Sequence, residues 1–307
     1  MAILVVGAGA TGGYFGLRLA EAGRDVTFLV RPRRAEVLRK RGLRVTGFGG
    51  DARIEPQLIG AAQINRRYDT VLLTVKATAL QQALDDVAPA VSPDTRIVPF
   101  LNGMAHLDEL NRRFGSETTL GGVVKVATQL NADGDIVRLA PLGSMEIGTQ
   151  DRTVDARVEQ VAAELSGADF DFAVSADVVA AMWHKWVFIA TIGAFTCLMR
   201  APIGDVVACP GGADLGRAIL AETAAVSDGA GYPVAPETVK GIESVVTEAG
   251  SAFASSMYRD LTEGSATEGE HILGDLVARA RRFGVATPLL DLATLQLRVY
   301  EHRRSRG

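Results

Sequence analysis

The sequence predicts an α/β protein in which a domain built on a parallel sheet precedes a domain made only of helices. A strand-like run at residues 3–6 leads into a glycine-rich loop, and an apolar-periodic stretch follows that loop. Strand and helix patterns alternate through the first half of the chain, which is typical of βαβ units. From Val178 onward only helical periodicity is present, so we expect a boundary near Ser175 and domains at 1–175 and 176–307.

The glycine-rich loop has the form G-x-G-x-x-G and consists of Gly7, Ala8, Gly9, Ala10, Thr11 and Gly12. In this pattern Gly7 allows a tight turn and Gly9 lets the backbone approach a pyrophosphate. Gly12 lets the following helix pack closely on the strand. The N-terminus of that helix offers N–H groups and a partial positive charge to phosphates. Glycines also serve ordinary turns, but the strand before the loop and the helix after it favour a Rossmann-type dinucleotide site.

The end of the next predicted strand, residues 25–30, indicates which nucleotide binds. NAD-binding chains usually place Asp or Glu there, and that carboxylate holds the ribose 2′-hydroxyl. Here the next residue is Arg31, and a guanidinium suits the charge and geometry of a 2′-phosphate. We therefore expect NADP (NADPH) as the cofactor. The alternative is a solvated basic turn that opens the next helix.

Composition favours a cytoplasmic enzyme that binds neither nucleic acid nor membrane. The 307 residues allow two cores, 48% of them are hydrophobic, and the net charge is −4. The chain enters a strand at once, which leaves no room for a signal peptide. The apolar stretch 186–199 is too short for a membrane span and is flanked by Lys185 and Arg200. Two cysteines and four scattered histidines predict neither a disulfide framework nor a metal site.

The remaining elements of the first domain follow from local patterns. We expect these strands to form a parallel sheet with helices on both faces. The predicted strands are 70–75, 96–101, 120–127, 136–139 and 145–147, and the predicted helices are 77–87, 105–114 and 155–165.

Polar residues stand directly after two of these strands. Lys76 follows the strand at 70–75, and Asn102 with Gly103 follows the strand at 96–101. Ligands of open α/β sheets bind beyond the carboxyl ends of the strands, so both side chains are candidates for contact with the cofactor or the reacting carbon. Taken singly, Lys76 is also explained as a surface lysine, and Asn102-Gly103 as a turn.

In the second domain the most unusual feature is a lysine in an apolar helix. Lys185 stands in the run Trp183-His184-Lys185-Trp186, and the positions after it are strongly apolar. Such a lysine either extends to solvent or lies in a pocket, where partial burial lowers its pKa and lets it act as an acid. Farther on, Thr267 and Glu268 open another helix, where an N-cap and a first-turn acid explain them structurally.

Together these landmarks resemble the ketopantoate reductases, or 2-dehydropantoate 2-reductases, over nearly the whole chain. The matching segments are 7–12, Arg31, 75–77, 102–104, 183–185, 255–257 and 267–268. The resemblance implies a 6-phosphogluconate dehydrogenase-like fold with the active site between a Rossmann domain and a helical domain. It also implies that NADPH delivers hydride to C2 of a 2-oxo acid, such as 2-dehydropantoate in pantothenate biosynthesis.

The resemblance also implies roles for individual residues. Lys185 would be the general acid and would stabilise the developing oxyanion by its charge. Asn102 would contact both nicotinamide and substrate, and Glu268 would help to hold the cofactor and bias Lys185. Ser256 would bind the substrate. The glycine loop, Arg31, Lys76 and the backbone of Ala127 would bind the cofactor.

Four positions depart from the family pattern. Where ketopantoate-reducing members commonly carry asparagines, this chain has Ile189, Gly193, Ile203 and Phe253. A pocket that loses its hydrogen-bonding groups loses discrimination for a substrate hydroxyl, so we expect a bulkier or less polar 2-oxo acid. The alternatives are another hydroxy-acid or polyol dehydrogenase of this build and a non-catalytic NADP-binding regulatory protein. A homodimer is compatible with the sequence, which does not establish it.

Overall fold

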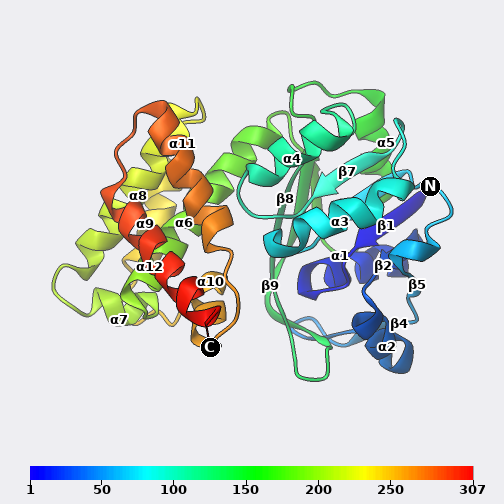
Figure 1. Ribbon diagram of the computed structural model, residues 1–307, viewed down its shortest axis with the longest axis horizontal. Coiled ribbons are helices and arrows are strands. Elements are labelled where there is room, and N and C mark those ends of the chain that lie inside the picture. Colours follow the sequence, from blue (N-terminus) through cyan, green and yellow to red (C-terminus); the bar gives the residue numbers. More distant parts are fainter. Residues whose placement is uncertain (307) are drawn as a thin grey trace. The chain divides into compact units, whose positions relative to one another are not determined.

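The computed structural model describes residues 1–306, which divide into two compact units (Figure 1). Unit 1 contains Met1–Leu101 and His106–Ala181. Unit 2 contains Asn102–Ala105 and the chain from Met182 onward. Unit 1 is α/β and unit 2 is helical, which confirms the predicted fold class.

The central sheet of unit 1 has five strands in the order β5-β2-β1-β6-β7, and every neighbouring pair is parallel. This confirms the predicted parallel sheet. Alternate residues of β1 enter two different apolar clusters, with Ile3 and Val5 in one and Leu4 and Val6 in the other. Both faces of the sheet are therefore covered, as is usual for parallel sheets. The strands are β1 (Ala2–Val6), β2 (Asp25–Leu29), β5 (Gln57–Ile59), β6 (Thr70–Leu73) and β7 (Arg96–Pro99).

Helices cover this sheet, and most of them agree with the predicted ranges. They are α1 (Ala10–Glu21), α2 (Pro32–Arg41), α3 (Leu80–Val87), α4 (Ala105–Phe114) and α5 (Ala156–Leu165). Single 3₁₀ turns occur at Ala61–Gln63, Ala77–Ala79 and Ala88–Ala90. The segment expected as one helix at 77–87 is thus a 3₁₀ turn followed by α3.

The strands predicted at 120–127, 136–139 and 145–147 do not belong to the parallel sheet but to a second sheet. For these strands the predicted parallel arrangement is wrong. β8 (Gly121–Leu130) and β9 (Ile136–Gly148) form an antiparallel hairpin, and the two predicted strands at 136–147 are one. Their connection is too short for a parallel crossover, which needs roughly a dozen residues. Asn131 closes the turn, since its Oδ1 accepts from two backbone N–H groups at 3.0 and 2.9 Å. The sheet is completed by β3 (Leu43–Gly47), β4 (Ala52–Ile54) and β10 (Asp171–Val174) in the order β10-β9-β3-β4.

Unit 2 is built around α6 (Val178–Met199), most of which lies in this unit. This helix has 22 residues and a mean hydropathy of 1.5 in its most apolar window, so by length and composition it could span a membrane. The helix begins eight residues before the apolar stretch 186–199, which taken alone is shorter than a membrane span. However, 61% of the window is buried inside the protein, and Trp186 and Phe195 are fully buried. In this structure α6 is a core helix.

The other helices of unit 2 are α7 (Ile203–Val207), α8 (Gly212–Gly229), α9 (Pro236–Val246), α10 (Ser256–Thr262), a π-helical turn (Glu270–Gly274), α11 (Asp275–Phe283) and α12 (Pro288–Arg304). Of these, α8, the π-helical turn and the start of α10 contact α6, and α7, α9, α11 and α12 pack against α8.

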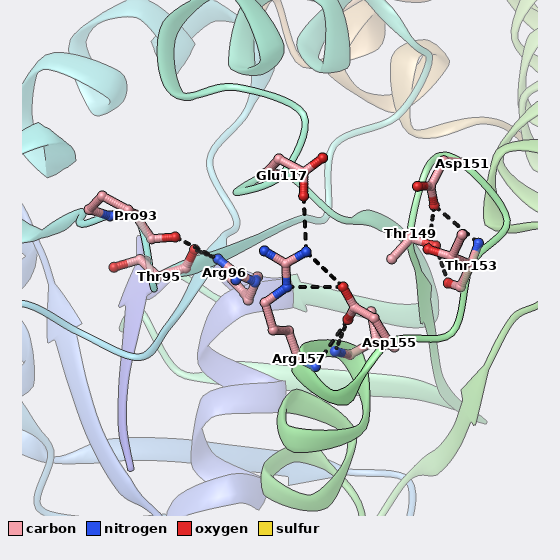
Figure 2. A network of polar contacts seen from close by, with 10 residues as sticks. Pro93, Thr95, Arg96, Glu117, Thr149, Asp151, Thr153, Asp155 and Arg157 are labelled. Carbon is pink, nitrogen blue, oxygen red and sulfur yellow. Dashed lines mark hydrogen bonds and ion pairs between the residues drawn. The ribbon is translucent and has the colours of Figure 1, made fainter.

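A polar network lines a cavity of about 80 Å³ in unit 1 (Figure 2). Arg157 contacts both Asp155 and Glu117 at 2.9 Å, and Asp155 caps the N-terminus of α5. Arg96 is only 4% exposed and donates to two backbone carbonyls; burial and the nearby Arg157 lower the pKa of its guanidinium. Because Arg96 begins β7, the cavity lies at the amino ends of the strands, whereas the glycine loop follows the carboxyl end of β1. We assign this network a structural role.

A buried carboxyl on α5 gives a testable consequence for stability. Glu164 is 8% exposed; its Oε2 accepts from the Thr70 hydroxyl at 2.8 Å, and its Oε1 has no partner among the described residues. Burial raises the pKa of Glu164 above its ordinary value. For such an acid, the favourable contribution to folding is present at low pH and is lost as the pH rises through the folded-state pKa.

We therefore expect Glu164→Gln to raise the free energy of unfolding at neutral pH by roughly 0.5–1 kcal/mol. The gain should disappear toward pH 4. Urea unfolding at a series of pH values measures this difference, with the exposed Glu159→Gln on the same helix as control. Destabilisation by Glu164→Gln at neutral pH would contradict the argument.

Candidate active site

The glycine loop is shaped to receive an anion. It follows the carboxyl end of β1, and α1 begins at Ala10 with Gly9 as its N-cap. No side chain caps this helix and its first turn holds no acidic residue. The first N–H groups of α1 therefore lack the intrahelical acceptors that later turns have. Gly7 has a φ of +99°, which only glycine adopts without strain.

Two of the loop glycines serve different physical purposes. A Cβ on Gly12 would lie 2.0 Å from the Thr74 hydroxyl and 2.3 Å from the backbone oxygen of Gly7, so the packing of α1 on the sheet excludes any side chain there. A Cβ on Gly9 would meet nothing within 4 Å. Gly9 therefore faces open space, and its lack of a side chain is not required by the protein's own packing. Such a space suits a pyrophosphate against the backbone.

The structure also shows two residues that hold this loop and that sequence reasoning missed. Arg34 donates from Nε to the carbonyl of Ala8 at 2.8 Å and from Nη1 to the carbonyl of Gly134 at 2.7 Å. The hydroxyl of Thr74 lies 2.9 and 2.8 Å from the carbonyls of Val6 and Gly7. These contacts join segments that are far apart in the chain, and no local pattern signals them.

The other predicted cofactor residues of unit 1 lie at strand ends or strand irregularities. Arg31 is exposed and is the N-cap of α2, two residues after the end of β2. Lys76 is exposed and precedes the 3₁₀ turn that follows β6. Ala127 lies where the β8–β9 ladder shifts register, between Val126 and Thr128. The regular pairing of β8 is interrupted there, as suits a position whose backbone is to meet a ligand.

Asn102 belongs to unit 2, although it comes soon after β7. The next residue, Gly103, has a φ of +78°, and a Cβ there would lie 3.3 Å from the backbone oxygen of His271. The segment 102–105 therefore packs with the π-helical turn. Asn102 and Lys185, which are far apart in the chain, are thus in one compact unit.

Hydrogen bonds connect the helix of Lys185 to the segment of Glu268. The indole of Trp186, the residue after Lys185, donates to the carbonyl of Ile272 at 3.0 Å. The N–H of Ile272 in turn donates to the carbonyl of Glu268 at 2.9 Å. Lys185 and Glu268 both have intermediate exposure. π-Helical turns occur often at functional sites, and this one begins two residues after Glu268.

Lys185 shares one face of α6 with apolar residues. Phe188, Ile189 and Gly193 follow it at three, four and eight residues, so they form one stripe along the helix. The ring of Phe188 stacks on Phe253, with centroids 6.4 Å apart. Phe253 is 45% exposed. A partly open aromatic pair therefore lies about one helical turn from the lysine.

Residues in α10 and just before it contact two of the positions that depart from the family pattern, Gly193 and Ile203. A Cβ on Gly193 would lie 2.1 Å from Cε of Met257, so the methionine fills the space that a larger side chain would need. Ile203 is fully buried, and its N–H donates to the carbonyl of Phe253 at 3.0 Å. The side chain of Ile203, at a position where family members commonly carry asparagine, therefore belongs to the core of unit 2.

The two serines of this segment have different roles in the fold. Ser255 caps α10 by accepting from the N–H of Tyr258 at 3.0 Å, and its hydroxyl lies 2.9 Å from that of Thr196. Ser256 is exposed, and no hydrogen bond of its side chain to another described residue is observed. Ser256 is thus the serine that remains available to a ligand.

A parallel sheet with an uncapped glycine loop, together with a lysine-bearing helical unit, is the arrangement expected of a nucleotide-dependent oxidoreductase. The family model of ketopantoate reductase PanE/ApbA matches residues 3–152, and the model of its C-terminal part matches residues 177–301. The chain therefore belongs to the ketopantoate reductase family, whose members bind a nicotinamide cofactor.

Known proteins are similar over the whole chain. YkpB of Bacillus subtilis, described as an uncharacterized oxidoreductase, is 34% identical over 98% of this chain and 99% of its own. A 2-dehydropantoate 2-reductase structure from Methylococcus capsulatus has a TM-score of 0.87 at 28% identity, covering 100% of this chain and 99% of that one. D-mandelate dehydrogenase with NADH and anilino(oxo)acetate shares the fold, with a TM-score of 0.89 at 23% identity over 99% and 100% of the two chains.

Proposed function

We propose that the protein is an NADPH-dependent reductase of a 2-oxo acid with an apolar tail. The observation that carries the proposal is Lys185 on α6, one helical turn from the partly exposed Phe188–Phe253 pair. An ammonium group next to an apolar wall can polarise and protonate a carbonyl oxygen while the wall receives the rest of the substrate.

The glycine loop supports the nucleotide part of the proposal. Open space at Gly9 and uncapped N–H groups on α1 fit a pyrophosphate. Arg31 is exposed after β2, where a guanidinium would pair with a 2′-phosphate. Lys76 and the backbone of Ala127 are further candidates for contact with the cofactor. The reduced nicotinamide, when bound, supplies the hydride.

The residues of unit 2 would then perform the remaining steps. Lys185 would donate a proton to the oxygen on C2 and would stabilise the negative charge that develops there. Asn102 would orient the carbonyl, and Glu268 would favour the charged form of Lys185. Ser256, which the fold leaves available, would bind the carboxylate.

The apolar side chains near Lys185 are the basis for the proposed substrate class. 2-Dehydropantoate carries a hydroxyl on its tail, and a pocket selective for it would need partners for that hydroxyl. Here Ile189, Gly193 and Phe253 supply none from their side chains. An aryl or branched aliphatic tail would instead remove apolar surface from water against Phe188 and Phe253. We therefore propose such a 2-oxo acid in place of 2-dehydropantoate.

Steady-state NADPH oxidation with a panel of 2-oxo acids tests this function. We expect kcat/KM for phenylglyoxylate or a branched-chain 2-oxo acid to exceed that for 2-dehydropantoate by roughly tenfold or more, since one well-placed apolar group gives about 1–3 kcal/mol. Phe253→Asn should reduce or reverse this ratio. NADPH should also bind more tightly than NADH in calorimetry.

Different outcomes of the panel exclude different parts of the proposal. Preference for 2-dehydropantoate would overturn the substrate class and leave the reaction class in place. NADPH binding without turnover of any carbonyl would favour a non-catalytic NADP-binding protein. If the 2-oxo acids are not turned over and NADP⁺ is instead reduced with another hydroxy acid or a polyol, a different dehydrogenase is favoured.

A further inference from the structure

The side chain of Arg34 places a positive charge beside the glycine loop without an ion pair to any described carboxylate. Its Nε and Nη1 donate to the carbonyls of Ala8 and Gly134, and its Nη2 is buried with no partner among the described residues. The acid whose charge acts on it, Asp135, is already bound by Arg41 at 3.3 and 2.6 Å. Burial lowers the pKa of the Arg34 guanidinium, which reflects the cost of withdrawing this charge from water.

The segments next to Arg34 supply no negative charge from their helix starts. The first turns of α1 and α2 contain no acidic residue, and α2 begins with the basic residues Arg31, Arg33 and Arg34 around Pro32. A half-buried cation that is not neutralised by its own chain increases the attraction of the site for an anion. The protein's own packing therefore leaves the charge of Arg34 to be balanced by a ligand.

The hydrogen bond from Arg34 to Ala8 also fixes the direction of a backbone N–H. The peptide between Ala8 and Gly9 is trans and planar, so its carbonyl and the N–H of Gly9 point in opposite directions. Because the carbonyl points to Arg34, the N–H of Gly9 points away from it. No acceptor for this N–H is found among the described residues, so it is left for a ligand.

We propose that Arg34 is a positioning residue for the pyrophosphate of the dinucleotide: it holds the Ala8–Gly9 peptide with its N–H toward the phosphates and supplies positive charge beside them. This inference rests on the proposed function. It differs from the role proposed for Arg31, which concerns the 2′-phosphate alone. NADPH and NADH both contain the pyrophosphate, so Arg34 acts on the two nucleotides alike, whereas Arg31 acts on NADPH.

Calorimetric titration of Arg34→Met with NADPH and with NADH tests the proposal. We expect the affinity for both nucleotides to fall by a similar factor of roughly ten- to a hundredfold, because a charge-assisted contact is lost. Arg34→Lys keeps the charge but lacks the planar fork that reaches two carbonyls, so it should recover part of the affinity. Arg31→Gln, titrated for comparison, should lower the affinity for NADPH and leave that for NADH unchanged.

Asp135→Asn is the control for a purely structural role, because Arg34 also holds the turn between β8 and β9 through Gly134. Asp135 holds the same turn by its ion pair with Arg41 at 2.6 Å, so this variant should lower Tm. It should not lower the affinity for either nucleotide, since it removes a negative charge that acts on Arg34. If Asp135→Asn weakened binding as much as Arg34→Met does, the effect would come from the turn and the proposal would be overturned.

The remaining outcomes separate this inference from the proposed function. Unchanged affinities in Arg34→Met would overturn the role of Arg34 and leave the proposed function in place. A loss confined to NADPH would assign Arg34 to the 2′-phosphate and would overturn its assignment to the pyrophosphate. A wild-type chain that binds neither nucleotide would overturn the proposed function together with this inference. Circular dichroism should show folded variants, and if Arg34→Met does not fold, an equal loss for both nucleotides in Arg34→Lys carries the test.

Discussion

Replacing Lys185 with alanine is expected to lower kcat for the best 2-oxo acid by roughly 10²–10⁴-fold, because the change removes both a proton donor and a charge that stabilises the oxyanion. The affinity for NADPH should remain within about threefold of wild type, since the glycine loop belongs to unit 1 and Lys185 to unit 2. Stopped-flow measurement of single turnovers, together with calorimetric titration of NADPH, separates these two quantities.

Two further variants define the role of this lysine. Lys185→Arg keeps a positive charge, but a guanidinium stays protonated at any pH of the assay and is a poor proton donor. It should therefore recover only part of the lost kcat. Lys240→Ala removes an exposed lysine from α9 and should leave kcat unchanged. If Lys185→Ala turned over at the wild-type rate, the lysine would be a solvent-directed side chain with no part in the chemistry.

The second large effect is expected in the glycine loop, where alanine at Gly12 should lower the stability of the fold. Alanine at Gly9 should instead lower the affinity for NADPH. Gly12→Ala should lower the free energy of unfolding by roughly 2–4 kcal/mol, since its methyl group would overlap a backbone carbonyl and the hydrogen-bonded Thr74. Gly9→Ala meets no protein atom within 4 Å and should fold as stably as wild type. Its methyl group should nevertheless weaken NADPH binding by tenfold or more, because it occupies the approach of the pyrophosphate.

Chemical unfolding and calorimetric titration of both variants measure this separation. Gly241→Ala is a matched control, since Gly241 lies in α9 and a Cβ there also meets nothing within 4 Å. It should leave NADPH binding unchanged and slightly increase stability. Wild-type affinity for NADPH in Gly9→Ala would show that the nucleotide does not bind against this loop.

Local patterns were sufficient to predict much of the fold. The buried run of β1, the glycines after it and the helix α1 are signalled by adjacent residues, because backbone conformation and alternating burial act over a few positions. The helices of unit 2 are likewise signalled by the periodicity of neighbouring residues. The positions of Lys76 and Asn102 after strands are equally local. The family resemblance then supplied roles for these residues, which the proposed experiments test.

Contacts between distant residues could not be predicted in this way. The hairpin of β8 and β9 was assigned to the wrong sheet because strand patterns do not encode partners. The contacts of Arg34 with the carbonyls of Ala8 and Gly134 join residues that are 26 and 100 positions apart in the chain. The filling of the space at Gly193 by Met257 joins segments more than 60 residues apart.

The sequence by itself determined that a strand, a glycine turn and a helix begin an α/β domain and that a lysine stands in an apolar helix. Only the tertiary structure decided that an aromatic pair accompanies this lysine, that Asn102 packs with the helical unit and that Arg34 binds the glycine loop. The physical reason is that propensity and periodicity act between near neighbours in the chain. Side-chain packing, by contrast, depends on which distant segments meet.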